Sequence, residues 1–403
     1  MTVCRFCSTP LTEVVADLGV LPLSNALVRP GGLAAPETFY PLVISVCHRC
    51  FLVQTPLAET PERIFSDYPY FSSYSDDCVR WAREYFEAIR PRLDLGPQSQ
   101  VVEIASNDGY LLQNFVNAGI PSLGIEPAAN VAAAAQAKGI ESRTEFFGSV
   151  VGADIKGRAD LLIANNVLAH VPEINDFVEG LRLALAPRGT ITIEFPHLLQ
   201  IIRFVQFDTM YHEHMSYLSL RVVQRILEAH GLAVTDVEEI PAHGGSLRVY
   251  AQHRGAAAGP RVESVLAKER EFGLESLDAY RAFSEGIARC RRSLLRFLID
   301  AREEGKQVAG YGAPAKASTL FNYCGVRADL LSYTVDRSPH KQGMYVPGVR
   351  IPIFAPEKIA ETRPDYVLIL PWNLRDEIVA QMTHVRDWGG RFVIAIPRTE
   401  VVA

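Results

Sequence analysis

The stretch TMYHEHMSYLSL, residues 209–220, gathers side chains that can exchange protons near neutral pH. Tyr211, His212, Glu213 and His214 occupy four consecutive positions. Imidazole titrates near neutrality, so a neutral histidine can act as a general base at pH 7. An extended segment would place Tyr211 and Glu213 on one face and the histidines on the other. A helical turn would instead make Tyr211 and His214 neighbours, and the sequence leaves both arrangements open.

The two histidines of this stretch could also be ligands of a metal ion. The sequence offers no obvious third and fourth ligand beside His212 and His214, so we expect proton chemistry here. We select His214 as the base and Glu213 as the group that tunes it, with His212 orienting the loop. The isolated His197 and His243 are expected to be structural.

Two short cysteine pairs point to a separate metal site. Cys4 and Cys7 form one Cys-x-x-Cys pair, and Cys47 and Cys50 form the other. In a reducing compartment such pairs bind tetrahedral Zn²⁺ more often than they form disulfides. A redox role is the alternative, but no strand–CxxC–helix unit surrounds either pair. Four thiolates close the coordination sphere, so we expect a structural zinc that stabilises a small β-rich module.

Polar residues stand where successive predicted strands end. Ligands of open α/β sheets bind beyond the carboxyl ends of the strands, so these residues are candidates for a cofactor site. The candidates are Glu103, Asn107, Asp108, Gly109, Glu126, Pro127, Phe146, Asn165 and Asn166. Gly109 would allow close backbone approach, Glu126 would accept bonds from ribose hydroxyls, and Phe146 would stack on a base. The glycine spacing of a dinucleotide site is absent, so S-adenosylmethionine fits better than NAD.

Strands and helices alternate over most of the chain, which predicts an α/β protein with parallel sheets. We expect a zinc-binding module over residues 1–75 and a cofactor-binding domain over 76–255. A helical linker over 256–304 and a Rossmann-like domain over 305–403 complete the chain. A hairpin near the end of the second region would add an antiparallel edge strand.

Composition excludes several functional classes. The 403 residues carry a net charge of −6 and are 48% hydrophobic, so no basic surface for nucleic acid is indicated. No apolar run reaches the ~20 residues of a membrane helix, and no signal peptide is visible. We therefore expect a cytoplasmic monomer that binds neither nucleic acid nor membrane.

Taken together, these motifs resemble the S-adenosylmethionine-dependent sugar C-methyltransferases of deoxysugar and antibiotic biosynthesis. The resemblance covers nearly the whole chain and rests on the cysteine pairs, EIASNDGYLL, GIEPAANVA, NNVLAHVPEINDF, YHEHMSYLSL, HGGSLRVY, GYGAPAKASTLFNYCG, VDRSPHKQG and LILPWNL. It implies a class I methyltransferase domain. It also implies C-methylation of a nucleotide-linked 4-keto-deoxysugar, with dTDP as the carrier and C3 favoured over C5.

The resemblance also implies an active site around the opening stretch. Carbon methylation beside a ketone requires a base to form the enolate and a donor to hold its oxygen. Tyr211, Glu213 and His214 would line this site. His170 is expected to donate to the enolate oxygen, and Tyr70 is a second phenol donor.

The substrate diphosphate needs positive charge and hydrogen-bond donors. The residues expected to bind the nucleotide sugar are Gly244, Gly245, Ser246, Arg248, Lys316, Ser318, Asp336 and Arg337. An O- or N-methyltransferase of a small molecule, an NAD-dependent sugar oxidoreductase and a non-catalytic zinc scaffold are the alternatives.

Overall fold

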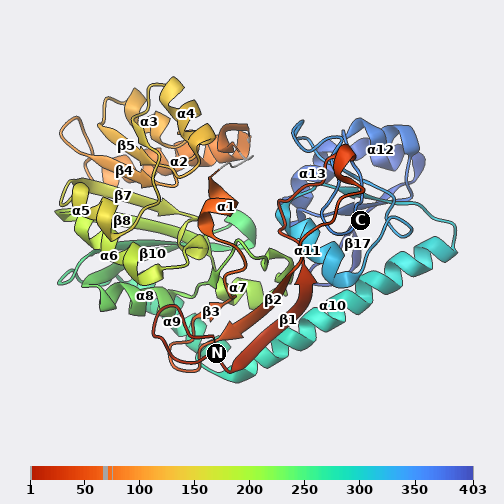
Figure 1. Cartoon of the computed structure of the whole chain (residues 1–403), viewed down its shortest axis with the longest axis horizontal. Coiled ribbons are helices and arrows are strands. Elements are labelled where there is room, and N and C mark those ends of the chain that lie inside the picture. The colour runs from red at the N-terminus through yellow and green to blue at the C-terminus, as the bar shows by residue number, and fades with distance from the viewer. Residues whose placement is uncertain (1, 67–70, 75, 403) are drawn as a thin grey trace.

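The computed structural model describes residues 2–66, 71–74 and 76–402 of the chain. Their strands form three separate sheets. Figure 1 shows the second and third sheets in two lobes, with the long strands of the first sheet lying beneath and between them. None of the helices in these ranges is long and apolar enough to cross a membrane.

The first sheet is small and antiparallel, and its strands follow the order β1-β2-β3-β9. Three of its strands come from the N-terminal region: β1 (Glu13–Leu21), β2 (Tyr40–Val46) and β3 (Val53–Gln54). Apolar side chains alternate with polar ones along β2, as expected for a strand with one buried face. The fourth strand, β9 (Ser216–Tyr217), comes from the stretch that opened the sequence analysis.

The second sheet has seven strands in the order β10-β11-β8-β7-β4-β5-β6. They are β4 (Val101–Ile104), β5 (Ser122–Ile125), β6 (Ser142–Arg143), β7 (Ala159–Asn165), β8 (Leu185–Pro196), β10 (Leu232–Ile240) and β11 (Ser246–His253). All pairs are parallel except those of β11. This is the strand arrangement of a class I methyltransferase, and it confirms the predicted fold class. The antiparallel strand is not at the edge as predicted, because β11 lies between β8 and β10.

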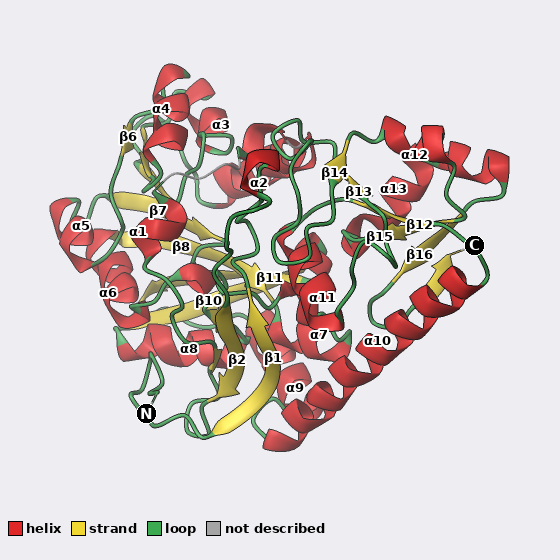
Figure 2. Ribbon diagram, turned by 45° about the vertical axis from the view of Figure 1, so that its right-hand side comes forward, coloured by secondary structure: helices red, strands yellow, loops and turns green. Residues whose placement is uncertain are grey.

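Helices lie around this sheet because its central strands are buried along their whole length. The helices of this region are α2 (Asp76–Arg92), α3 (Leu112–Asn117), α4 (Ala129–Ala137), α5 (Ser149–Asp154), α6 (Ile174–Ala184), α7 (Leu198–Arg203) and α8 (Leu220–Ala229). A short helix, α1 (Pro61–Phe65), precedes them. Two helices follow, α9 (Pro260–Phe272) and α10 (Leu277–Glu303), and α10 runs along one side of the molecule in Figure 2.

The third sheet has the order β14-β13-β12-β15-β16-β17 and is parallel except for β17. Its strands are β12 (Val308–Tyr311), β13 (Thr334–Val335), β14 (Ile353–Phe354), β15 (Tyr366–Ile369), β16 (Arg391–Ile394) and β17 (Glu400–Val402). Its helices are α11 (Ala315–Cys324), α12 (Glu357–Thr362) and α13 (Arg375–Gln381). Counted along the chain, the strands lie in the order 3-2-1-4-5-6, which is the doubly wound order of nucleotide-binding folds.

Candidate active site

The loops after β4 and β5 are tied together by one carboxylate. Glu126 accepts hydrogen bonds from the backbone N–H groups of Asn107 and Ala128, each at 2.9 Å. Burial raises the pKa of Glu126, and the two backbone donors partly offset that effect. Asn107 has a left-handed backbone with φ 52°, and its side-chain oxygen accepts from the N–H of Ser72 at 2.8 Å. The predicted ribose acceptor is therefore held in place before any ligand binds.

Several buried polar atoms at this edge have no hydrogen-bond partner among the described residues. They are Oε2 of Glu103, Oγ of Ser106 and both side-chain amide atoms of Asn165. Buried polar groups are nearly always paired in folded proteins, so these atoms indicate room for a polar ligand. S-adenosylmethionine carries hydroxyl, amino and carboxylate groups that can pair with them. Burial also raises the pKa of Glu103 well above its usual range, with Glu126 and Asp108 adding to the effect.

Among the remaining cofactor candidates, some are accessible to a ligand and others are hydrogen-bonded within the fold. Phe146 is 40% exposed and can stack on a base, and Pro127 is half-buried beside Glu126. Asp108 is engaged in the fold, since its carboxylate accepts from Nζ of Lys138 at 3.0 Å. The N–H of Asn166 donates to the carbonyl of Glu194 at 2.7 Å.

Gly109 has a structural reason to be glycine besides the close approach to a ligand that the sequence analysis expects. A Cβ atom at this position would lie 2.1 Å from Cδ1 of Ile140, and φ is +75°. Packing and backbone conformation thus require glycine there, independently of any ligand.

The opening stretch adopts the turn rather than the extended form. The 3₁₀ helix η4 (Phe207–Thr209) leads into it, and the N–H of His214 donates to the carbonyl of Tyr211 at 2.9 Å. Nδ1 of His214 lies 2.8 Å from the carbonyl oxygen of Thr209. A carbonyl can only accept, so Nδ1 carries the proton. Nε2 then accepts from the phenol of Tyr211 at 2.8 Å.

A second imidazole faces this pair. The ring of His170, at the end of η3 (Leu168–His170), lies 4.8 Å from that of His214, centroid to centroid. Nδ1 of His170 donates to the carbonyl of Glu213 at 2.7 Å. Burial lowers the pKa of His170, and burial together with His170 holds the pKa of His214 well below its usual range. Both rings are therefore neutral at pH 7, and Nε2 of a neutral His170 has no proton to donate.

The zinc-binding module reaches into this site. Nδ2 of Asn25 donates to Oε2 of Glu213 at 2.7 Å, and Nε2 of His212 donates to the carbonyl of Tyr40 at 3.2 Å. Strand β9, which lies within the same stretch, pairs with β3 of the module. Asn25 was not selected from the sequence, because 188 positions separate it from Glu213. His212 fixes the loop, as expected, and the described residues place no third metal ligand beside it.

The C-terminal lobe closes the other side of the site. Nε1 of Trp372, in η6 (Trp372–Leu374), donates to Oδ2 of Asp208 at 2.8 Å. Nζ of Lys316 lies 4.4 Å from the centre of the Trp372 ring and donates to Oδ1 of Asn373 at 2.7 Å. Burial lowers the pKa of Lys316, and Asp208 opposes that effect. Asp208 and Trp372 were not selected from the sequence, although Trp372 lies in the LILPWNL motif.

The structure scatters the residues expected to bind the nucleotide sugar. Lys316 lies beside the opening stretch. Gly244 packs so tightly on Trp372 that a Cβ atom at position 244 would lie 2.5 Å from the Trp372 ring. Arg248 is buried in an ion pair with Glu194 at 2.5 Å. Ser318 is 2% exposed.

Asp336 and Arg337, the last two residues expected to bind the nucleotide sugar, directly follow β13. The carboxylate of Asp336 accepts from the N–H groups of Ala313 at 2.7 Å and of Ser338 at 2.8 Å. It thereby folds onto the loop that would hold a dinucleotide phosphate. Arg337 is exposed.

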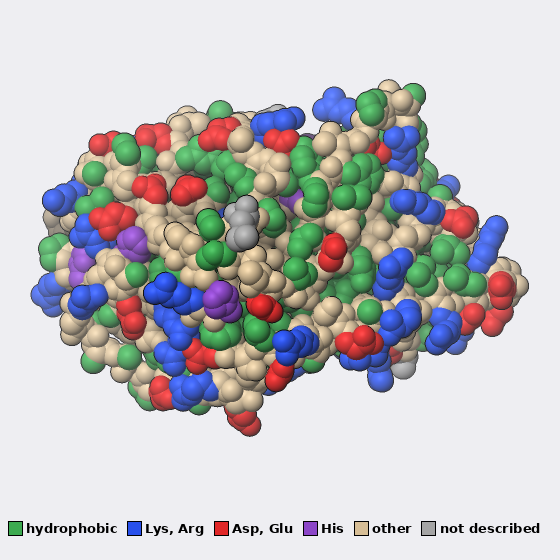
Figure 3. Space-filling view, turned by 60° about the horizontal axis from the view of Figure 1, so that its bottom comes forward, with side chains coloured by type: hydrophobic (Ala, Val, Ile, Leu, Met, Phe, Trp, Pro, Cys, Tyr) green, Lys and Arg blue, Asp and Glu red, His purple; other side chains and the backbone are tan. Residues whose placement is uncertain are grey.

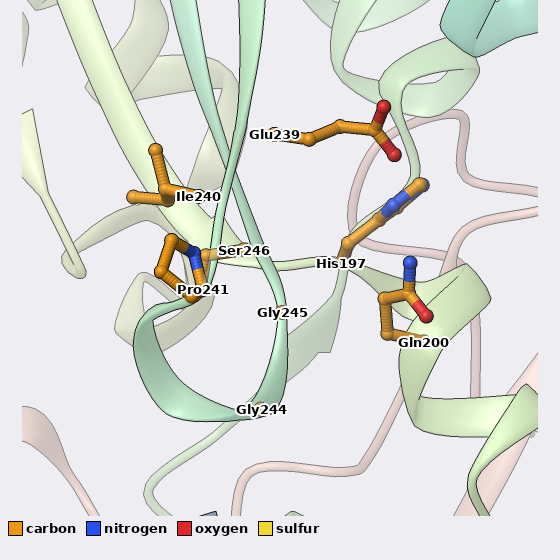
Figure 4. A pocket seen from close by; sticks show the side chains of 8 residues that line it. All are labelled: His197, Gln200, Glu239, Ile240, Pro241, Gly244, Gly245 and Ser246. Carbon is orange, nitrogen blue, oxygen red and sulfur yellow. The ribbon is translucent and has the colours of Figure 1, made fainter.

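An open hollow of about 480 Å³ lies beside the 3₁₀ turn η5 (Ala242–Gly244). In Figure 4, His197 and Gln200 stand across from Pro241 and Ser246. Gly245 lines the same hollow, and the hydroxyl of Ser246 donates to the carbonyl of Ala242 at 2.9 Å. His197 is structural, as expected, because its ring bonds the buried Glu269 at 2.7 Å. Figure 3 shows basic and acidic side chains interspersed over one face of the molecule.

Tyr70 lies outside the described residues. Its neighbours Ser72 and Ser73 bond Asn107 and Asp108, so the chain on one side of it reaches the cofactor edge.

The four predicted zinc ligands converge. Their sulfur atoms lie within 4.8 Å of one another, with Cys4 and Cys50 at 3.6 Å and Cys7 and Cys47 at 3.5 Å. Four sulfurs at the usual Zn–S length of ~2.3 Å stand roughly 3.8 Å apart in a tetrahedron. All four cysteines are free thiols, so the donor set fits zinc.

Comparison with known proteins accounts for most of the chain. Residues 4–65 match a zinc binding domain, residues 79–237 a methyltransferase domain, and residues 241–397 a C-methyltransferase C-terminal domain. The C-methyltransferase NovU of Streptomyces niveus is 35% identical over 405 residues, which cover 99% of this chain and 96% of that protein.

Two solved structures resemble part of the chain. The PH0226 protein of Pyrococcus horikoshii is 12% identical with a TM-score of 0.38, over 48% of this chain and 98% of its own. The 1,6-didemethyltoxoflavin-N1-methyltransferase of Burkholderia thailandensis is 16% identical with a TM-score of 0.35, over 45% and 80%. At TM-scores this low we draw nothing further from them.

Proposed function

The chain belongs to the S-adenosylmethionine-dependent C-methyltransferases that carry an N-terminal zinc-binding domain, and from this we propose that it methylates C3 of a nucleotide-linked 4-keto-deoxysugar. The reaction proceeds through an enolate made by a base of the enzyme. The observation that carries this proposal is the half-buried, hydrogen-bonded pair of Tyr211 and a neutral His214 beside the ring of His170. Methylation of oxygen or nitrogen would not need a base for a carbon acid.

Residues of the cofactor edge would hold S-adenosylmethionine. Glu126 would accept from the ribose hydroxyls, Asn165 and Glu103 would pair with polar groups, and Phe146 would stack on adenine. When bound, S-adenosylmethionine supplies a methyl group on a positively charged sulfur. The chain's own task is to hold the sugar carbon in line with that methyl and to exclude water.

Proton removal falls to the opening stretch. His214 cannot accept a second proton at Nδ1, so the proton that it gains on deprotonation of the substrate must go to Nε2. Tyr211 now bonds that nitrogen. Either its phenol moves aside, or it passes its own proton to His214 while taking the proton from carbon. Both routes leave His214 as an imidazolium opposite the enolate, and the second makes Tyr211 the group that meets the substrate.

The structure changes the donor that we propose for the enolate oxygen. A neutral His170 spends its one N–H on the carbonyl of Glu213, so it offers a lone pair towards the site. Lys316 retains N–H groups beyond the one given to Asn373, and a charged donor stabilises an oxyanion more strongly. We therefore assign the enolate oxygen to Lys316 and leave His170 to position the loop or accept a substrate hydroxyl.

The dTDP group would lie between the two lobes, where the carboxyl ends of β12 and β15 face the catalytic stretch through Trp372. Arg337 is exposed near this edge and can reach a phosphate. An NAD-dependent oxidoreductase is not supported, because Asp336 is committed to the loop after β12. We further propose that the protein is a monomer. We also propose that it acts in the reducing cytoplasm, where four cysteines stay available as zinc-binding thiolates.

Solvent exchange tests the proposal. The enzyme is incubated in D₂O with S-adenosylhomocysteine and a dTDP-4-keto-6-deoxyhexose, and NMR follows deuterium at C3 and C5. We expect enzyme-dependent exchange at C3. When ¹³C-methyl-labelled S-adenosylmethionine replaces S-adenosylhomocysteine, we expect a ¹³C-methyl group on C3. A methyl on oxygen or nitrogen would overturn C-methylation of this substrate, and a methyl on C5 would overturn the choice of carbon.

A further inference from the structure

We propose that Asn25, a residue of the zinc-binding module, is a positioning residue of the active site that holds the side chain of Glu213. Through the backbone of Glu213 it also sets the ring of His170. This inference deepens the proposed function and rests on it for the identity of the reaction. It gives the module a part in catalysis besides its part in folding.

The contact that carries the inference is buried and specific. The carboxylate of Glu213 is only 3% exposed, and Nδ2 of Asn25 donates to its Oε2 at 2.7 Å. Among the described hydrogen bonds, no other side chain donates to this carboxylate. A buried carboxylate is costly unless it is hydrogen-bonded, so the position of Asn25 decides where Glu213 can lie.

Glu213 passes this constraint on to the catalytic rings. Its carbonyl oxygen accepts from Nδ1 of His170 at 2.7 Å, and His170 faces His214 at 4.8 Å. A shift of the Glu213 backbone, to which the anchored side chain is attached, would therefore release the histidine that stands against the base. Displacements of about 1 Å in such groups can cost roughly 10²-fold in rate.

The module holds the same loop at two further points, so Asn25 does not act on a loose segment. The N–H of Thr55 donates to the carbonyl of Met215 at 3.1 Å, and Gln54 pairs with Ser216 where β3 meets β9. These contacts hold the chain at residues 215 and 216, after Glu213. They leave the direction of the Glu213 side chain to Asn25.

Asn25 also influences the charge of Glu213. Burial raises the pKa of Glu213 to about 7, and the hydrogen bonds from Asn25 lower it towards its usual value. The titratable groups next to it are His212 and His214 on its own loop and His170 on η3, and the pKa of each is lowered. Because these rings are neutral, loss of the Asn25 donor would raise the pKa of Glu213 further.

The test compares Asn25→Leu, which removes the side-chain donor at similar size and keeps the backbone one, with Asn25→Ser, which keeps a shorter side-chain donor. Asn175→Asp is the matched control. Asn175 ties α6 to the same module through the carbonyls of Arg5 at 3.3 Å and Phe6 at 2.9 Å, but it does not touch Glu213. Zinc content and thermal midpoint are measured for each variant.

For Asn25→Leu we expect kcat of methyl transfer to fall on the order of 10–100-fold. KM and affinity for S-adenosylmethionine should change little, and the acidic limb of the pH profile of kcat should move to higher pH. Asn25→Ser should recover part of the rate, and Asn175→Asp should keep the wild-type profile. An unchanged profile and kcat in a folded, zinc-loaded Asn25→Leu protein would overturn the inference.

A second readout separates this inference from the proposed reaction. The carboxyl pKa of Glu213 is followed by ¹³C NMR of glutamate-labelled protein, with Glu213→Gln identifying the signal. This titration needs no substrate, so it stands even if no keto-sugar reacts. We expect a higher pKa in Asn25→Leu, and an unchanged one would refute the role of Asn25. If Asn25→Leu does not fold, Asn25→Asp, which keeps the shape but loses the donor, replaces it.

Discussion

At the scale of single residues, the proposed mechanism depends on the hydrogen bond between Tyr211 and His214. The phenol occupies the one basic nitrogen of His214, at 2.8 Å. His214→Asn keeps some of the shape but cannot take the proton. Methyl transfer should fall by ~10²–10⁴-fold, the share of a general base. Cofactor affinity, measured by calorimetry, should remain near that of the wild type.

Solvent exchange with S-adenosylhomocysteine isolates deprotonation from alkylation, so it should fall in parallel in His214→Asn. Tyr211→Phe then distinguishes the two routes. If the phenol relays the proton, Tyr211→Phe and the double variant should be as slow as His214→Asn, because residues acting as a unit are not additive. Exchange at the wild-type rate in His214→Asn would remove His214 as the base.

Glu126 is the residue on which cofactor affinity should depend most directly. Each of its oxygens already accepts one backbone N–H at 2.9 Å, and each retains a lone pair for a ribose hydroxyl. Glu126→Ala should weaken S-adenosylmethionine binding by ~1.5–3 kcal/mol, the range for hydrogen bonds to a charged group. Calorimetry measures this loss. The exposed Glu141 provides a control as Glu141→Ala, and unchanged affinity of Glu126→Ala would remove Glu126 from the ribose site.

Residue types and their spacing were enough to select candidate site residues but not to predict the contacts between them. Tyr211, His214 and the four cysteines could be selected because their spacing is local. The turn that joins Tyr211 to His214 could not be predicted, because the sequence of residues 211–214 fits an extended segment and a helical turn equally well. Asn25 and Asp208 carry no local signal, and their partners Glu213 and Trp372 lie 188 and 164 positions away.

At the scale of elements, η4 and η6 meet across the two lobes through Asp208 and Trp372. Burial raises the pKa of Asp208 to about 6, and Lys316 and Trp372 partly offset that effect. The folded state therefore holds this proton to higher pH than the unfolded state, whose pKa is near 3.8. The resulting stability is complete below pH 3.8 and is lost as the pH rises through 6.

Asp208→Asn removes this titration but keeps an acceptor for Trp372. Between pH 4 and 7 the variant should gain about 3 kcal/mol in stability relative to the wild type, because the pKa of Asp208 is about 6 in the folded state and near 3.8 in the unfolded state. Urea unfolding across this range gives the difference. Asp329→Asn, at an exposed position, is the control. Parallel curves for Asp208→Asn and the wild type would show that Asp208 is ionised at both ends of the range.

Element order was predictable because buried runs and helical periods alternate clearly from β4 to β8. The short strands could not be predicted from the sequence. Strand β9 has two residues, too few to show a period, and it joins the module's sheet only because β3 offers its edge. The position of β11 was also missed, since a hairpin's sequence does not say which of its strands meets β8.

At the scale of the whole molecule, the zinc-binding module joins the two lobes. Val15, Leu42 and Ile44 of its sheet share one buried apolar cluster with α10, α11 and the third sheet. Cys4, Cys47 and Leu52 share another with the strands of the methyltransferase sheet. The module therefore has no separate core, and its folding depends on both lobes.

This continuity predicts how the protein responds to loss of zinc. Purified protein should contain about one zinc per chain. Cys50→Ser should lower the thermal midpoint and the solubility of the entire chain, because a structural zinc supplies folding free energy. Calorimetry should show one transition, shifted as a whole, since the module's side chains belong to the clusters of both lobes. Cys78→Ser, a half-buried thiol outside the zinc site, is the control. A zinc-free protein with the wild-type melting profile would contradict this account, and so would an early separate transition with the main one unmoved.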